Sequence, residues 1–187
     1  SGVWFNRIRS FEVGEYPQSK TVNFPMSCMH CETAECVTVC PTGASYKRPE
    51  DGIVLVDQDK CMGCNYCAWA CPYGARELDR ASGTMKKCTL CVDRLYVEAL
   101  PEAERQPACV LTCPTRARHF GDLDDPDSGV SAVVRERGGF QSMPELGYNP
   151  TNHYLPPRVQ RPSQQADRPR ASLQDKLKQW MAKAITK

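Results

Sequence analysis

Residues 61–72 read Cys-Met-Gly-Cys-Asn-Tyr-Cys-Ala-Trp-Ala-Cys-Pro, which puts four thiols on one short stretch of chain. Three thiols on a tight loop can hold three corners of a cubane iron–sulfur cluster, and the fourth then starts a short helix or turn and points away. Pro72 restricts φ and turns the chain out of the site. This stretch therefore predicts an iron–sulfur site with the fold arranged around it.

Cysteine groups of this kind occur three times. All twelve cysteines belong to them: Cys28, Cys31, Cys36 and Cys40; Cys61, Cys64, Cys67 and Cys71; Cys88, Cys91, Cys109 and Cys113. The second group has the spacing of the bacterial ferredoxin run C-x2-C-x2-C-x3-C-P, whose fourth cysteine ligates the other cluster of a pair. Each group ends in Cys-x3-Cys-Pro, and similar residues follow, so the chain carries an internal repeat. We predict that all twelve cysteines ligate the iron of 4Fe-4S clusters.

Disulfides and structural zinc are the alternative uses of so many cysteines. Cysteines packed into tight loops seldom sit well for bridging one another, which disfavours disulfides. Zinc sites use two pairs of ligands separated by a longer spacer, which the first two groups do not provide. The third group does have a pair, a spacer and a pair, so zinc stays an alternative there.

The rest of the composition leaves little material for a large hydrophobic core. The chain has 187 residues with 15 prolines, and its 41% hydrophobic fraction includes the 12 cysteines. A formal net charge of +2 argues against a general nucleic-acid binder. The sequence has no run of 18 apolar residues and no visible signal-peptide start. Since it begins with Ser1 rather than methionine, we expect a processed, tagged or truncated chain.

Local patterns predict short strands and few helices. Asp51-Gly52 between extended segments predicts a hairpin with strands at about 44–48 and 53–57. A weaker hairpin is expected from about 75–79 and 84–87. Apolar residues at helical spacing predict a helix over 91–100. The expected fold class is α+β with little regular structure, made of ferredoxin-like 4Fe-4S lobes with short β-hairpins, stapled by clusters, plus an extended C-terminal arm.

These patterns divide the chain into five regions. We expect residues 1–25 to be the remainder of an N-terminal lobe, 26–79 a ferredoxin-like lobe with two complete clusters, 80–122 a second ferredoxin-like lobe, 123–171 an extended arm or linker, and 172–187 a basic amphipathic helix. A disordered tail is the alternative for the arm. The terminal helix is suited to an anionic membrane surface or a partner, or is a solvated helix with one apolar face.

The order of these motifs resembles the four-cluster iron–sulfur subunit of the dimethyl sulfoxide reductase family. The residues that carry the resemblance are the three cysteine groups, Lys87-Cys88, Asp93-Arg94 and the run from Cys71 to Ala75, within about residues 4–122. Trp4 to Arg7 and the segment from Asn149 to Pro157 are most similar to the iron–sulfur subunit of membrane-bound sulfite dehydrogenases. Such subunits lie between a molybdenum (or tungsten) bis-pterin catalytic subunit and a quinone-interacting membrane anchor.

The resemblance also implies which cysteines share a cluster. Cys28, Cys31 and Cys36 would join Cys71, and Cys61, Cys64 and Cys67 would join Cys40. Cys88, Cys91 and Cys109 would need a fourth ligand from a family motif that this sequence lacks before Cys28, and Cys113 would serve a cluster held mainly by that motif. Either an N-terminal segment is missing, which we favour, or the third group closes a cluster by itself. At least two clusters are then complete in this chain, with three or four in the full protein.

No nucleophile–base pair or phosphate-binding loop stands out, so the chain is expected to be a non-catalytic electron carrier. The expected position is at the membrane through a partner, with the cytoplasmic face favoured over the periplasmic one. A stand-alone soluble polyferredoxin and a zinc-stapled structural module are the alternatives. Several side chains are candidates for tuning or shielding the clusters: Lys60, Lys86, Lys87, Arg94, Trp69 and His30.

Overall fold

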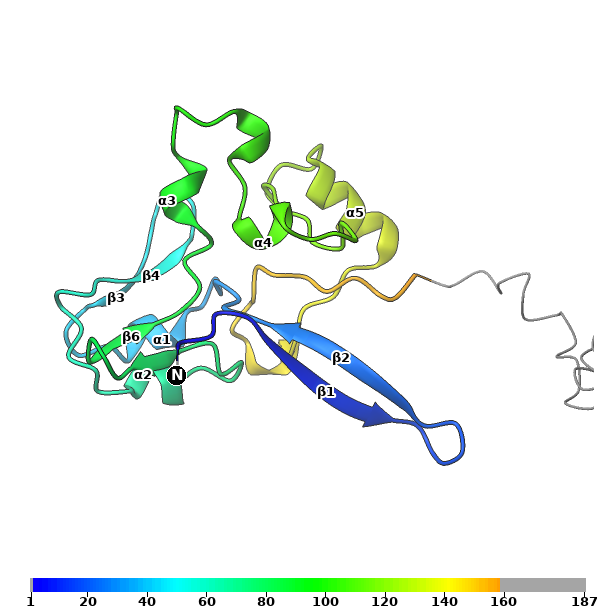
Figure 1. Ribbon diagram of the computed structural model, residues 1–187, viewed down its shortest axis with the longest axis horizontal. Coiled ribbons are helices and arrows are strands. Elements are labelled where there is room, and N and C mark those ends of the chain that lie inside the picture. Colours follow the sequence, from blue (N-terminus) through cyan, green and yellow to red (C-terminus); the bar gives the residue numbers. More distant parts are fainter. Residues whose placement is uncertain (1, 159–187) are drawn as a thin grey trace, which may run out of the picture. The chain divides into compact units, whose positions relative to one another are not determined.

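The computed structural model describes residues 2–158 (Figure 1). Contacts within the chain define a first unit that ends at Leu155 and a second that starts at Pro156. The first unit contains six strands: β1 (Arg7–Val13), β2 (Lys20–Met26), β3 (Ser45–Lys47), β4 (Val54–Val56), β5 (Glu77–Asp79) and β6 (Thr84–Lys86). Its helices are α1 (Glu35–Thr38), α2 (Tyr66–Trp69), α3 (Val92–Leu95), α4 (Ala108–Leu111) and α5 (Gly129–Arg137), with 3-10 turns at Glu102–Glu104 and Pro144–Leu146.

The strands form three separate antiparallel hairpins, β1–β2, β3–β4 and β5–β6 (Figure 1). The two hairpins predicted from the sequence are confirmed. In the first, Ser45 pairs with Val56 and Lys47 with Val54. Asp51 shapes its turn by accepting hydrogen bonds from the Ile53 amide at 3.0 Å and from Arg48. The molecule is therefore a small α+β fold of short elements, as expected.

The internal repeat is visible in the backbone around each cysteine–proline pair. Helices α1, α2 and α4 each begin one residue before the third cysteine of a group and end before the fourth. The amide of the fourth cysteine donates to a carbonyl three residues earlier in every group, with N–O distances of 3.1, 3.3 and 3.2 Å at Cys40, Cys71 and Cys113. The carbonyl of the same cysteine then accepts from the amide three residues later. The three repeats thus share one local geometry.

Three features differ from the sequence-based expectation. The helix expected over 91–100 is reduced to α3, because the chain turns after Leu95 and continues into a 3-10 turn. The N-terminal part forms the long hairpin β1–β2, which no pattern predicted. The segment expected to be an extended arm contains α5, whose N-cap Ser128 accepts a hydrogen bond from the Ser131 amide at 3.2 Å and whose C-cap is the left-handed Gly138.

Residues after α5 pack on the first cysteine loop. The amide of Glu32 donates to the Asn149 carbonyl at 2.8 Å, and the amide of Thr151 donates to the Met29 carbonyl at 3.1 Å. The phenol of Tyr73 donates to the Ser142 carbonyl at 3.2 Å. Residues 140–155 therefore stay with the cysteine-bearing part of the chain.

The helix predicted at 172–187 lies outside the described residues. Within residues 2–158, none of the helices has the length and apolar character to cross a bilayer.

The buried core is small and unusually polar. Its apolar members are led by Met29, Val54 and Met85, which are at most 2% exposed. Four polar side chains are buried with them: His30, Ser45, Arg76 and Lys87. The buried side chains come from the hairpins and the cysteine loops, so the core lies around the cysteines rather than beside them.

Candidate metal centres

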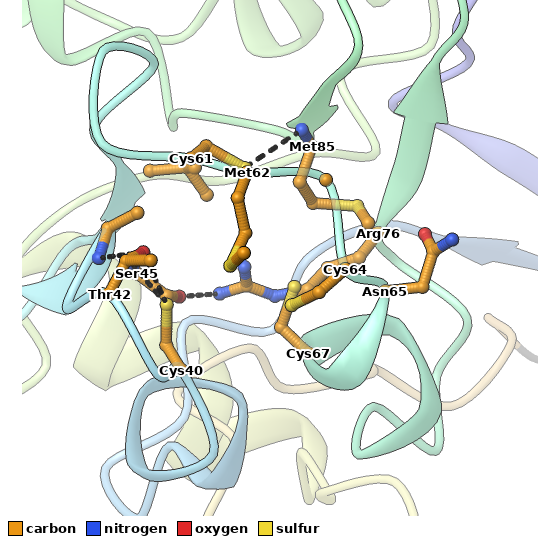
Figure 2. Close-up of a pocket in the computed structure, with 13 residues that line it drawn as sticks. Cys40, Thr42, Ser45, Cys61, Met62, Cys64, Asn65, Cys67, Arg76 and Met85 are labelled. Atoms are coloured by element: carbon orange, nitrogen blue, oxygen red, sulfur yellow. Dashed lines mark hydrogen bonds between the residues drawn. The ribbon is translucent and has the colours of Figure 1, made fainter.

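One cavity collects four cysteines from two groups (Figure 2). Cys61 and Cys64 come from the loop that leads into α2, Cys67 comes from α2 itself, and Cys40 comes from the end of the first group. Between them the cavity is lined by Ser45, Met62, Arg76 and Met85, among others. This is the combination of cysteines that the family resemblance implies for one cluster.

A second set of thiols surrounds Cys31. Burial first, and then the thiols of Cys28, Cys36 and Cys71, each of which would place negative charge nearby, together raise the pKa of the Cys31 thiol to about 12. Burial also raises the pKa of Cys36, against the opposing effect of Arg76. Thiols in this environment ionise only when a cation takes the proton's place, so they are suited to metal binding that releases protons. Cys71, from the second group, lies close enough to Cys31 and Cys36 of the first group to raise the pKa of both.

In the third group, Cys88, Cys91 and Cys109 lie near one another, whereas Cys113 contacts residues of its own loop. Burial raises the pKa of Cys88, and Cys28 and Cys109 act on it in the same direction. The amide of Ala108 donates to the Sγ of Cys91 at 3.4 Å and ties α4 to this loop. Cys113 contacts its own loop: a hydrogen bond from the Thr115 hydroxyl, then the amides of Ala117 and Arg118, lower its pKa to about 7.

Cys40, Cys61, Cys64 and Cys67 line a cavity rather than surround a single point. Among residues 2–158, no three cysteine, histidine or carboxylate side chains converge closely enough to hold one metal ion. A zinc ion needs every sulfur about 2.3 Å from one centre. The ligands of a cubane attach instead to separate iron atoms at its corners.

Backbone amides point at the cysteine sulfurs. The amides of Ser45 and Met85 each donate to a sulfur at 3.3 Å, to Cys40 and Cys61 respectively. The loops turn tightly enough to do this because residues inside them adopt positive φ, including Asn65 at 65° in the second group. Such loops form concave nests of N–H groups that are typical of iron–sulfur sites.

Two buried cationic side chains, Arg76 and Lys87, show whether the site suits a cluster that carries negative charge. Arg76 and Lys87 are 5% and 4% exposed, and no carboxylate is among the buried side chains of the described residues. Buried charges are costly unless they are paired. Arg76 donates from Nη2 to the Sγ of Cys36 at 3.0 Å, and Lys87 donates from Nζ to the Cys88 carbonyl at 2.7 Å. The residues present therefore fit a group that carries negative charge.

Of the other candidates from the sequence, Lys87 lies at the site, Lys86 lies on β6 opposite Glu77, and three lie away from the site. Lys60 pairs with Asp57 at 3.2 Å and its side chain is 65% exposed. Arg94 donates to the Glu104 carbonyl on the exposed surface. The expectation that Trp69 shields a cluster is wrong within this chain, because Trp69 is 77% exposed and its ring packs on Tyr66.

His30 is buried, and its Nδ1 accepts a hydrogen bond from the Val54 amide at 3.1 Å. Burial, together with the charges of Lys87 and Arg76, lowers its pKa well below the usual value. His30 therefore braces the first cysteine loop against β4 as a neutral side chain. Arg76 was not predicted from the sequence. Its position in the repeat, four residues after the Cys-Pro pair and equivalent to Ser45, was a signal that could have identified it.

Comparisons with known proteins agree with this chemistry. The 4Fe-4S dicluster domain family matches residues 19–123. The B subunit of the sulfite dehydrogenase of Allochromatium vinosum is 62% identical over 161 residues, which cover 86% of this chain and 67% of that protein. The iron–sulfur B subunit of a putative dimethyl sulfoxide reductase of Halobacterium salinarum is 41% identical over 76% of this chain and 60% of its own length. The beta subunit of the chlorate reductase of Ideonella dechloratans is 35% identical over 87% of this chain and 50% of its own length. The chain thus spans half to two thirds of the length of these relatives.

Proposed function

Because the chain belongs to the 4Fe-4S dicluster family and is an iron–sulfur electron-transfer subunit of the molybdoenzyme type, we propose that it relays single electrons between two partners. One is a molybdenum bis-pterin catalytic subunit, and the other is a quinone-linked subunit in the membrane. The similarity to the B subunit of a sulfite dehydrogenase favours sulfite oxidation as the reaction of the catalytic partner. The protein would then be held at the membrane by its partner, on the cytoplasmic face.

The interlocking of the first two cysteine groups carries this proposal. We assign one cluster to Cys28, Cys31, Cys36 and Cys71, and a second to Cys61, Cys64, Cys67 and Cys40. The cavity in Figure 2 supports the second set, and the mutual effects of the thiols on Cys31 support the first. Each group lends its fourth cysteine to the other set, so the two clusters are close neighbours. Cys88, Cys91, Cys109 and Cys113 are assigned to further cluster sites.

The clusters, when bound, supply one-electron storage. The chain's own residues do the rest of the work. Thiolates would hold the iron, and loop amides such as those of Ser45 and Met85, which donate to cysteine sulfurs, would stabilise the negative charge. Buried Met85 lines the cavity of the second set and keeps water from it. This arrangement favours electron storage and transfer, with substrate chemistry left to the partner.

The test uses Cys64→Ser in the complete complex, with Ala81→Ser at the exposed β5–β6 turn as the control. We expect the loss or change of one cluster signal and slow electron flow from substrate to quinone. Oxidation of substrate with an artificial dye at the catalytic subunit should persist. Unchanged quinone-linked flow despite a damaged cluster would contradict the proposal, as would dye-linked activity residing in this chain alone.

A further inference from the structure

Arg76 lies between the two interlocked cysteine sets. Its Nη2 donates to the Sγ of Cys36, in the set built around Cys31, with 3.0 Å between the atoms. The same side chain lines the cavity of the other set, alongside Cys40 and Cys67 (Figure 2). Its positive charge also opposes the effect of burial on the pKa of Cys67. One guanidinium therefore faces the ligands of both clusters.

The internal repeat explains this position. Arg76 is the fourth residue after Pro72, and Ser45 is the fourth after Pro41, so the two occupy equivalent places in the first two repeats. They meet: Nη2 of Arg76 donates to the Ser45 hydroxyl at 2.6 Å (Figure 2). The Ser45 amide in turn donates to the Sγ of Cys40 at 3.3 Å. The pair thus lies at the junction of the two repeats, and Ser45 holds the guanidinium in place.

One nitrogen of the guanidinium, Nη1, has no hydrogen-bond acceptor among the described residues. Among the described residues, the buried side-chain nitrogen and oxygen atoms that lack a partner are Arg76 Nη1 and His30 Nε2. A buried donor on a charged group without an acceptor is costly. The negative charges that favour the charged form of Arg76 are those of Cys36, Cys67 and Cys28, so these thiolates and the clusters they would hold balance the buried guanidinium.

We propose that Arg76 is a positioning residue shared by the two clusters, which raises both of their reduction potentials together. The inference rests on the proposed function for the assignment of cysteines to clusters. Reduction adds one negative charge to a cluster, and a fixed positive charge nearby stabilises the reduced form. Because Arg76 serves both sets, the two potentials rise in step. Arg76 therefore changes the difference between the two potentials less than it changes either potential.

The test is Arg76→Met in the anaerobically purified complex, with both midpoint potentials measured by redox titration followed by electron paramagnetic resonance. Both potentials should fall, each by on the order of a tenfold change in the reduction equilibrium, which is about 59 mV for one electron. Arg80→Met removes the same charge from an exposed turn four residues later and should leave both potentials in place, because water and salt screen that position. The cluster signal of the third cysteine group should move less than the other two.

Arg76→Lys and Ser45→Ala provide second variants in case Arg76→Met fails to assemble its clusters. Arg76→Lys keeps the positive charge but loses the planar guanidinium with its several N–H donors. Ser45→Ala keeps Arg76 but removes the hydroxyl that holds the guanidinium in place. Each variant should therefore lower both potentials by less than Arg76→Met does. A shift of only one potential, or of neither, in a variant with full iron content would overturn the inference. These readouts need no turnover, so a failure to reduce quinone would count against the proposed function and leave the inference on Arg76 standing.

Discussion

Asn152 donates from Nδ2 to the backbone carbonyl of Cys28, with 3.1 Å between the atoms and 124 positions of sequence between the residues. Beside it, the Thr151 hydroxyl donates to the Met29 carbonyl at 2.9 Å. The first cysteine loop is therefore closed from outside by a segment from the far end of the described chain. This contact holds the loop that carries Cys28 and Cys31 in its tight conformation.

Loosening this contact should make the first cluster site labile. Each of Thr151→Val and Asn152→Ala removes a hydrogen bond and should lower the free energy of unfolding by about 1 kcal/mol. Iron should then be lost to a chelator faster from the site that includes Cys28 than from the other sites. The measurement is the rate of iron loss, followed with the cluster signals.

Ser10→Ala, which removes an exposed hydroxyl contact to Asn23 on β1–β2, is the control and should leave that rate unchanged. Equal rates in all variants would show that the segment does not brace the loop.

Glycine at position 63 is required by a close approach of backbone. A Cβ there would lie 2.3 Å from the Gly83 carbonyl oxygen, and φ is +70°. Gly63→Ala should therefore displace the loop of Cys61 and Cys64 and cost the protein one cluster, or about four irons per chain.

Gly43→Ala is the matched control for this change. Gly43 also has positive φ, +65°, but a Cβ there meets nothing within 4 Å. It should cost about 1 kcal/mol of backbone strain and leave the iron content intact. Iron analysis of both variants decides the matter, and full iron content in Gly63→Ala would refute the steric argument.

Lys87 should act on a different pair of sites from Arg76. Its buried ammonium donates to the carbonyls of Val54 and Cys88, and it lies close enough to Cys28 and Cys88 for each to favour its charged form against burial. Lys87→Met should lower the potentials of the cluster containing Cys28 and of the site containing Cys88, each by roughly tenfold in the reduction equilibrium. The potential of the cluster in the Figure 2 cavity should change least. Redox titration of the three signals checks the pattern, and a uniform shift of all three would argue against it.

Docking of the β1–β2 hairpin should weaken in acid. The Trp4 amide, donating at 3.1 Å, and then Arg7 lower the pKa of Glu77. A lowered pKa means that the stabilisation is fully present above the unfolded value of about 4.3 and is lost as the pH falls through the lower folded value.

Glu77→Gln isolates this contribution. Its difference in apparent melting temperature from the unaltered protein should be constant well above about pH 4.3 and should shrink as the pH falls below that value. The difference should be small, since the Arg7 and Glu77 side chains are 32% and 34% exposed. Glu12→Gln, which changes an exposed carboxylate on the same hairpin, is the matched control. A melting-temperature difference for Glu77→Gln that persists unchanged at about pH 3 would contradict the assignment.

Sequence spacing predicted the parts of the molecule that depend on local chemistry. The cysteine groups, the Asp51-Gly52 turn and the repeat after each Cys-Pro all act over a few residues, and the hairpins β3–β4 and β5–β6 follow from them. Contacts between residues that are far apart in the sequence could not be predicted from this spacing. Arg76 and Cys36 meet across 40 positions and Asn152 and Cys28 across 124, and neither pair has a periodic signature. The exposure of Trp69 was mispredicted because its position within a cysteine loop does not determine which way its ring turns.

The Ser128 and Gly138 caps of α5 were present in the sequence, but weak apolar periodicity concealed the short helix between them.

The exchange of the fourth cysteine between the first two groups is the central claim, and one comparison tests it directly. Cys31→Ser, Cys71→Ser and Cys64→Ser would each be titrated with electron paramagnetic resonance of the reduced clusters. The account predicts that Cys31→Ser and Cys71→Ser alter the same cluster signal, while Cys64→Ser alters another. If Cys71→Ser instead altered the signal affected by Cys64→Ser, each group would hold its own cluster and the exchanged sets would be wrong.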